Sequence, residues 1–155
     1  MKIDFWVIGK NNERFIDDGI QVYLKKIKYF TEINFQVFTD IKGIKEIVIL
    51  KEKEAEKYLS KIESDDYVIL LDENGTTFSS RKFAQFIEQR QNQSIRKCIF
   101  IAGGAFGFDK RLYQRANIKI SLSEMTFSHQ LIRIIFLEQL YRAYSIIHNF
   151  PYHND

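Results

Sequence analysis

The sequence predicts a single α/β domain in which helices flank a mainly parallel β-sheet. Apolar runs of strand length alternate along the chain with longer segments of helical period, the usual pattern of strands joined by crossover helices. The chain has 155 residues, the ordinary size of one domain. Because no repeat, linker or low-complexity segment divides it, we expect one domain over residues 1–155.

The first part of the chain predicts two strands and two helices. Residues 2–9 form an apolar run of strand length that ends at Gly9, and residues 12–28 carry apolar side chains at helical spacing. Residues 33–39 predict a second strand. Residues 44–62 are ambiguous, since "IVIL" is typical of a strand whereas the later apolar positions have helical spacing. We interpret this segment as a helix with an undefined start.

A third strand and a capped helix are expected next. Residues 67–75 begin as an apolar run and end in the turn-forming pair "NG". Ser79 or Ser80 can cap a helix over residues 81–91, because a serine hydroxyl accepts a hydrogen bond from an amide of the first turn.

The remaining strands frame a short helix. Residues 97–109 combine a fourth strand with a glycine-rich loop, and Asp109 can cap a helix over residues 110–116. Residues 118–122 predict the last strand. Three predicted strands thus end in "DENG", "GGAFG" and "SLSEMTF", and we hypothesise that these strand ends converge on one pocket.

Composition indicates a folded protein of the cytoplasm. Apolar residues make up 45% of the chain and charged residues 28%, away from the signature of disorder. The single cysteine, Cys98, lies in an apolar run, where we expect a buried reduced thiol. The sequence contains neither a signal peptide nor an apolar run of the roughly 20 residues that a membrane helix needs, so we expect no membrane association. The net charge of +3 permits an RNA partner without arguing for one.

The glycine loop has two interpretations. Gly103, Gly104 and Gly107 follow a buried strand at the end where ligands bind in open α/β sheets. The dinucleotide-binding fingerprint fails because Ala102 stands where its first glycine is needed, and the lysine of a P-loop is absent. The residues alone leave open whether this loop holds a ligand or is only a tight turn.

A final helix, capped by Ser128 and running to about Asn149, is apolar on nearly its whole circumference. A helix of this kind is buried on all sides, and in so small a chain we infer that one side faces a second copy, giving a homodimer. Arg133, Glu138 and Arg142 interrupt the apolar surface. Glu138 and Arg142 have the spacing of an intrahelical ion pair, or one of them faces a ligand.

All three histidines and the only proline lie in the last 27 residues, at His129, His148, Pro151 and His153. The terminal "PYHND" is either a frayed end or part of a site. The sequence lacks the usual spacings of metal ligands and the nucleophile motif of α/β-hydrolases, so we expect no metal. A nucleotide hydrolase on a doubly wound sheet finds no support.

The segments "VIGK", "FIAGGAFGF", "SLSEMTFSHQLIRIIFLEQLYRAYSI" and "PYH" together resemble small bacterial methyltransferases that act on a pseudouridine in large-subunit ribosomal RNA. The resemblance covers the whole chain. These enzymes are of the SPOUT class, and the resemblance implies a C-terminal trefoil knot and a homodimer formed through the last helix. One departure is Ser128, where the family commonly has proline.

The resemblance also implies that the three strand ends hold S-adenosylmethionine in a bent conformation. The residues that match the cofactor contacts of the family are Leu71, Gly103, Gly104, Leu122, Ser123, Glu124, Met125, Thr126 and Phe127.

The implied reaction is methylation of N3 of pseudouridine. This imide nitrogen is nearly fully protonated at neutral pH, so a base or a stabilising charge is required. The groups that the resemblance offers are His129, Glu138, Arg142, Tyr152 and His153. We expect Arg142 to stabilise the developing negative charge, Glu138 or a histidine to accept the proton, and the two tail residues to form a lid over the base.

The rival interpretation is a catalytically silent RNA- or ribosome-binding module with the same fold. The intact "GGAFG" and "PYH" segments favour the enzyme. Because phosphate neutralisation dominates affinity for RNA, the small net charge leads us to expect an assembled ribosomal surface as substrate.

Overall fold

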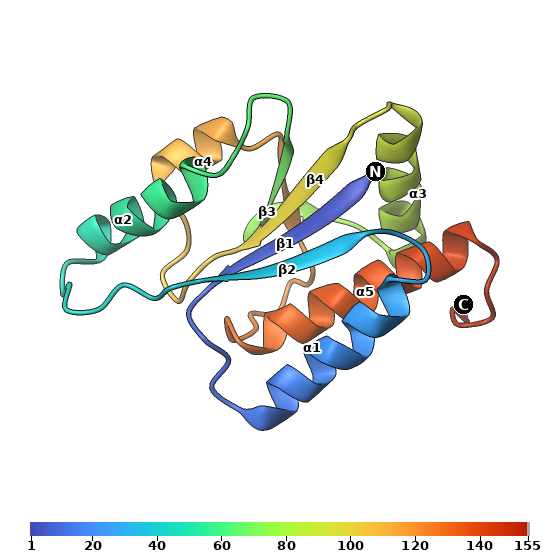
Figure 1. The fold of residues 1–155 in the computed structure, drawn as a ribbon, viewed down its shortest axis with the longest axis horizontal. Coiled ribbons are helices and arrows are strands. Elements are labelled where there is room, and N and C mark those ends of the chain that lie inside the picture. Colours follow the sequence, from blue (N-terminus) through green and yellow to red (C-terminus); the bar gives the residue numbers. More distant parts are fainter. Residues whose placement is uncertain (155) are drawn as a thin grey trace.

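A computed structural model describes residues 1–154 and confirms the α/β prediction, with one five-stranded parallel sheet flanked by helices (Figure 1). The strand order is β2-β1-β4-β3-β5. The strands are β1 (Lys2–Ile8), β2 (Ile33–Phe38), β3 (Tyr67–Thr77), β4 (Lys97–Ala102) and β5 (Ile118–Ser121). The helices are α1 (Arg14–Ile27), α2 (Ile47–Leu59), α3 (Ser80–Asn92), α4 (Lys110–Arg115) and α5 (Leu131–Ile147).

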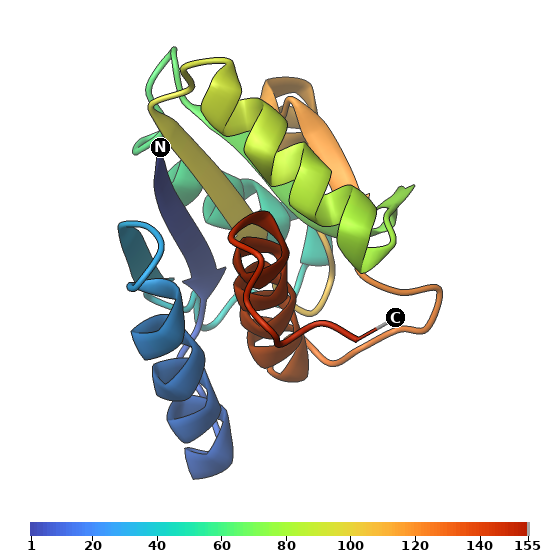
Figure 2. The ribbon, with the colours of Figure 1, turned by 90° about the vertical axis from the view of Figure 1, so that its right-hand side faces the viewer.

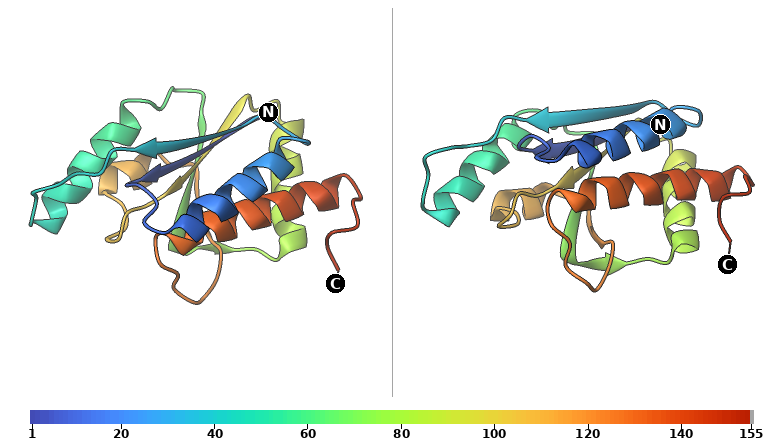
Figure 3. Two further views of the ribbon diagram at one scale, coloured as in Figure 1. Left: turned by 60° about the horizontal axis from the view of Figure 1, so that its bottom comes forward. Right: turned by 90° about the horizontal axis from the view of Figure 1, so that it is seen from below.

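The helices form a layer on each face of the sheet. α1, α3 and α5 cover one face, and α5 lies beside both of the others (Figures 1 and 3). α2 and α4 cover the opposite face. The central strands are buried from both sides, as parallel strands usually are; five of the six residues of β4 are buried. The Phe136 ring of α5 lies 4.5 Å from Phe5 and 4.7 Å from Phe100, which joins this helix to the middle of the sheet.

The ambiguous segment before β3 is helical, as interpreted, but only from Ile47 onward. The apolar "IVIL" run forms the first turn of α2, where Ile47, Val48 and Ile49 are exposed. Ala55 and Tyr58 are the residues that bury the helix against the sheet. The run therefore resembles a strand in composition only, because its side chains have no neighbouring strand to cover them.

The predicted end of β3 is wrong. The strand does not stop in a turn at Asn74 and Gly75 but continues to Thr77. Leu71 and Thr76 both pair with Ile120 of β5, so the four residues between them bulge out of the ladder. A Cβ atom on Gly75 would lie 2.6 Å from the backbone of Ile120, so only glycine fits where the strand returns to the sheet.

Replacing Gly75 by alanine should destabilise the protein by about 1–3 kcal/mol, the usual penalty for overpacking. The neighbouring atoms are backbone of β5, which cannot move aside as a side chain could. Urea unfolding would measure the loss, with Asn74→Ala, an exposed neighbour, as the control. A Gly75→Ala variant as stable as the parent would contradict the close approach.

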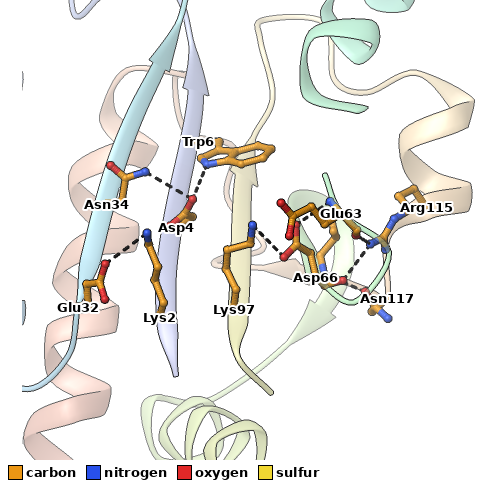
Figure 4. Close-up of polar contacts among 11 residues, drawn as sticks. Lys2, Asp4, Trp6, Glu32, Asn34, Glu63, Asp66, Lys97, Arg115 and Asn117 are labelled. Atoms are coloured by element: carbon orange, nitrogen blue, oxygen red, sulfur yellow. Dashed lines mark hydrogen bonds and ion pairs between the residues drawn. The ribbon is translucent and has the colours of Figure 1, made fainter. Parts of the chain in front are cut away.

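Separate polar contacts lie toward the amino ends of the strands (Figure 4). The buried Asp66 carboxylate accepts from Lys97 of β4 at 2.9 Å and from the Glu63 amide at 2.8 Å. In β1, buried Asp4 accepts from the indole of Trp6 at 3.2 Å. In a parallel sheet the amino and carboxyl ends of the strands lie at opposite edges, so these contacts stabilise the edge away from the loops that follow the strands.

Candidate functional site

The loops after β4, β3 and β5 meet in one cavity of about 450 Å³, which we call the first cavity. Since these strands are neighbours in the parallel sheet, their carboxyl ends lie side by side at one edge. The walls come from residues 71–74, 102–108, 120–123 and 125–127, with one residue added by α2, one by α4, and His129 and Ile132 from around the start of α5. The hypothesis that three strand ends converge on one pocket is confirmed.

The glycine loop is both a tight turn and a cavity wall. The Gly107 amide donates to the Gly104 carbonyl at 3.3 Å, closing the turn. A Cβ atom on Gly104 would lie 3.1 Å from both carboxylate oxygens of Glu54 in α2, closer than most side chains tolerate. Absence of a side chain thus lets the loop approach α2, and the turn presents Phe106, which is 54% exposed, at its tip.

Eight of the nine residues expected to contact a cofactor line the first cavity. The exception is Glu124, which is exposed and is not part of the wall. The segment after β5 is held by its own hydrogen bonds: Ser121 Oγ donates to the Ser123 carbonyl at 2.8 Å, and Ser123 Oγ accepts from the Met125 amide at 2.9 Å. The wall therefore has a defined shape, built mostly from backbone and small polar groups.

The wall includes residues that sequence reasoning missed, among them Lys51, Asp72 and Tyr113. The Tyr113 hydroxyl donates to an Asp72 carboxylate oxygen at 2.5 Å, and burial together with this bond raises the pKa of Tyr113 to about 12. Asp72 could have been found from its place directly after an apolar run. Lys51 comes from α2, far from the three loops in sequence, and neither it nor Tyr113 of α4 carries a local signal.

The first cavity suits a small organic cation with an apolar body. Its volume is within the range of about 300–1,000 Å³ that is usual for small-molecule sites. Asp72 and Glu73 place carboxylates on the wall, while Leu71, Leu122 and Phe127 contribute apolar surface. The residues present thus fit an adenosyl group attached to a positively charged sulfonium.

A second cavity, of about 1,080 Å³, adjoins the first. It lies at the carboxyl ends of β1 and β2 and under α2, and it shares Gly104, Ala105, Phe106 and His129 with the first cavity. Polar side chains line the rest of its wall, among them Lys10, Asn12, Asp40, Lys42 and Glu54. The two cavities together form a continuous site with the glycine loop at their junction.

His129 stands at this junction, as one of the catalytic candidates. Burial, and then the positive charge of Arg133, lower the pKa of its imidazole from the ordinary value. The ring is therefore neutral at pH 7 and can accept a proton.

Arg133 lies between α5 and the end of β1, and its guanidinium is almost completely buried. It donates to the carbonyls of Ile8 at 2.8 Å and Gly9 at 3.0 Å, to Asn11 Oδ1 at 2.6 Å, and to the His129 carbonyl at 3.1 Å. Arg133 interrupts the apolar surface of the predicted helix, and the sequence could not show its partners, because all but His129 are more than 120 residues away.

The other catalytic candidates gather along the middle of α5 and beyond its carboxyl end. Glu138 Oε1 accepts from Arg142 Nε at 3.1 Å and from the Tyr152 hydroxyl at 3.1 Å, and Arg142 Nη1 lies 3.3 Å from His153 Nδ1. The Arg142 guanidinium carbon is 4.7 Å from the centre of the Tyr152 ring. The predicted ion pair is confirmed, and the tail packs on α5 instead of fraying.

The chain reverses direction just before the tail. Asn149 has a left-handed backbone conformation, and the Phe150 amide donates to the Ser145 carbonyl at 2.8 Å. Figure 2 shows the tail crossing the carboxyl end of α5. The last residue, Asp155, lies outside the described residues.

Within one chain the tail does not reach the cavities. Ile132 is on the wall of the first cavity, whereas Arg142 is ten residues further along α5. At a rise of 1.5 Å per residue this places the two about 15 Å apart along the helix. The convergent loops and the tail lie at opposite ends of α5 (Figure 3).

Residues 1–154 contain no group of three or more histidine, cysteine, aspartate or glutamate side chains placed to hold a metal ion. None of the helices in that range is long and apolar enough to cross a membrane.

Comparison with known proteins identifies relatives of the whole chain. Residues 1–153 match the family described as "Predicted SPOUT methyltransferase". The chain is 42% identical over 156 residues to ribosomal RNA large subunit methyltransferase H of Christiangramia forsetii, with 99% of each chain covered. It is 40% identical over 156 residues to the protein of that name from Flavobacterium johnsoniae, again covering 99% of each, and 40% identical over 157 residues to that of Parabacteroides distasonis, covering both completely.

Proposed function

The chain belongs to the SPOUT methyltransferase family, and on that premise we propose that it transfers a methyl group from S-adenosylmethionine to N3 of a pseudouridine in large-subunit ribosomal RNA. The observation that carries the proposal is the first cavity, because the chain's counterparts of the family's cofactor contacts come together there from three separate loops. The full-length similarity to proteins named as ribosomal RNA methyltransferases supports the substrate class. Action on ribosomes places the protein in the cytoplasm.

S-adenosylmethionine supplies an electrophilic methyl group on a positively charged sulfur. Backbone at Leu71, Gly103, Gly104 and Leu122 would hold the adenosyl part, with the segment from Ser123 to Phe127, including Glu124, closing over it. We propose that the three loops have the trefoil-knotted arrangement of the family. Such loops hold their shape without a ligand, so that little ordering entropy is lost on binding.

The acting form in our proposal is a homodimer with a shared site. On the outer face of α5 the side chains of Leu131, Ile134 and Ile135 are only partly covered, and Phe15 and Val22 are exposed on the adjacent α1. A second copy would bury these apolar groups. The tail and the cavities are at opposite ends of α5, so two antiparallel α5 helices would bring the tail of each protomer to the cavities of its partner.

In this arrangement the tail cluster acts on the target base of the partner's site. Arg142 stabilises the negative charge that develops on the imide, and Tyr152 with His153 covers the base. Glu138 already accepts hydrogen bonds from Arg142, Tyr152 and Gln139, so its carboxylate positions the first two. His129, at the junction of the two cavities, would contact the base from the side of its own chain.

Transfer of labelled methyl groups from S-adenosylmethionine tests the proposal. Naked rRNA, isolated subunits and assembled ribosomes would be compared, and nucleosides from the product analysed by mass spectrometry for methyl on N3 of pseudouridine. We expect the fastest transfer on assembled particles. Equal turnover on naked rRNA would contradict the need for an assembled surface, and no transfer to any substrate would favour the silent binding module.

A further inference from the structure

The carboxylate of Glu54 lies at the junction of the two cavities. It belongs to the wall of the second cavity and packs against Gly104, which borders both. Among residues 1–154 no side chain or amide donates a hydrogen bond to it, and it forms no ion pair within 4.0 Å. A half-buried acid without partners, beside the glycine loop of a cofactor site, is available to a ligand.

The surroundings make this carboxylate a stronger base than an ordinary glutamate. Burial, and then the negative charge of Asp40, raise the pKa of Glu54, while Lys57 lowers it to a smaller extent. Charged or titratable groups surround Glu54 on its own helix, on the segments after β1 and β2, on α1 and just before α5: Lys57, Tyr58, Lys10, Asp40, Lys42, Asp17 and His129.

Glu138, the carboxylate that the resemblance offers as proton acceptor, is less suitable. Its oxygens already accept from Arg142, Tyr152 and Gln139, and hydrogen bonds to the ionised form make a carboxylate a weaker base. Glu54 has no such bonds and is on the cavity wall of its own chain. The exposed ring of Phe106 at the junction adds a surface on which a base can stack.

We propose that the second cavity receives the target base and that the Glu54 carboxylate accepts the proton of its N3 atom, an inference that rests on the proposed function. The N3–H bond breaks and the proton moves to a Glu54 oxygen. The electron pair left on N3 forms the bond to the methyl carbon, and the pair of the breaking carbon–sulfur bond stays on sulfur. Sulfonium and carboxylate thus become neutral thioether and carboxylic acid, and Glu54 then releases the proton to solvent.

The proposal has a definite pH dependence. Below its pKa Glu54 is protonated and cannot accept a proton, so single-turnover methylation falls as the pH decreases through that value. This fall at low pH is the acid limb of the pH–rate profile, and it should disappear in Glu54→Gln. Transfer by the variant at pH 7 should fall by about 10²-fold or more, the usual contribution of a general base. The rate of the variant should recover at high pH, where N3 ionises without help.

Two measurements separate a catalytic role from a structural one. Calorimetry should show unchanged binding of S-adenosylmethionine to Glu54→Gln, and Glu52→Gln, the same change at an exposed position of α2, should methylate normally. Carbon-13 NMR of labelled glutamate should show one carboxyl that titrates above the ordinary value of about 4.3 and is missing in Glu54→Gln. Asp40→Asn should move that titration and the acid limb together to lower pH.

The outcomes distinguish this inference from the function on which it rests. A wild-type protein that binds no S-adenosylmethionine overturns both. If the wild type is active and Glu54→Gln methylates within about threefold of its rate, only the role of Glu54 is overturned. The same holds if the variant retains the acid limb. If Glu54→Gln does not fold, the Asp40→Asn variant provides the test. The role of Glu54 as proton acceptor is overturned if the NMR titration of its carboxyl moves in Asp40→Asn while the acid limb of methylation stays at the same pH.

Discussion

Deleting Tyr152 to Asp155 is expected to lower methyl transfer by about 10²-fold or more, the scale of losing a positioned acid-base or stacking group. The deletion removes the ring that covers Arg142 and the imidazole beside its guanidinium. It leaves the walls of both cavities and the apolar face of α5 unchanged. Binding of S-adenosylmethionine and dimerisation should therefore remain close to those of the intact protein.

Single substitutions separate the roles within the tail. His153→Ala should mainly slow the chemical step. Tyr152→Phe should be mild if the ring acts by stacking and severe if its hydroxyl bond to Glu138 is needed to hold the lid. Single-turnover methylation of the ribosomal substrate is the measurement, and a truncated dimer with an unimpaired rate would refute the proposed role of the tail.

Arg133→Met should reduce the free energy of unfolding by about 3 kcal/mol. The substitution keeps the apolar stem but leaves the carbonyls of Ile8, Gly9 and His129 without their donor, at about 1–3 kcal/mol for each buried group that stays unsatisfied. Removing a buried charge offsets part of this loss. Because Arg133 links the end of β1 to the start of α5, cofactor affinity should fall as well.

Urea unfolding and calorimetry would measure the two effects of Arg133→Met. Arg14→Ala is the matched control, since the Arg14 side chain is 93% exposed and its ion pair with Asp18 lies on the surface. We expect that control to change stability by no more than about 0.5 kcal/mol. Full stability of Arg133→Met would mean that water replaces the guanidinium as donor.

Local sequence signals predicted most of the fold. Asp109 caps α4 by accepting from the Arg111 amide at 2.9 Å, and Ser79, one of two serines considered, caps α3. The predicted cap of α5 is not at Ser128: the helix begins at Leu131 with Gln130 at its N-cap, and Ser128 Oγ accepts from the Leu131 amide at 3.1 Å in the turn before it. The error at the end of β3 arose because "NG" is a local turn signal, whereas the pairing that continues the strand is with distant β5.

The candidate site was predictable only where it is built from segments with local sequence signals. Loops that follow apolar strands can be found in the sequence, and neighbouring parallel strands bring their ends together. Lys51 and Glu54 could not be found, because they belong to α2, whose orientation over the glycine loop depends on tertiary packing. The distance between the tail and the cavities is likewise a property of the folded helix.

Isothermal titration with S-adenosylmethionine tests the central claim most directly. We predict saturable binding by the folded protein, with an affinity between about 1 μM and 1 mM, the usual range for enzyme substrates. S-adenosylhomocysteine should compete, because it shares every part that the first cavity would hold except the methyl group. A well-folded protein that binds neither compound would contradict the assignment of the first cavity and, with it, the proposed methyl transfer.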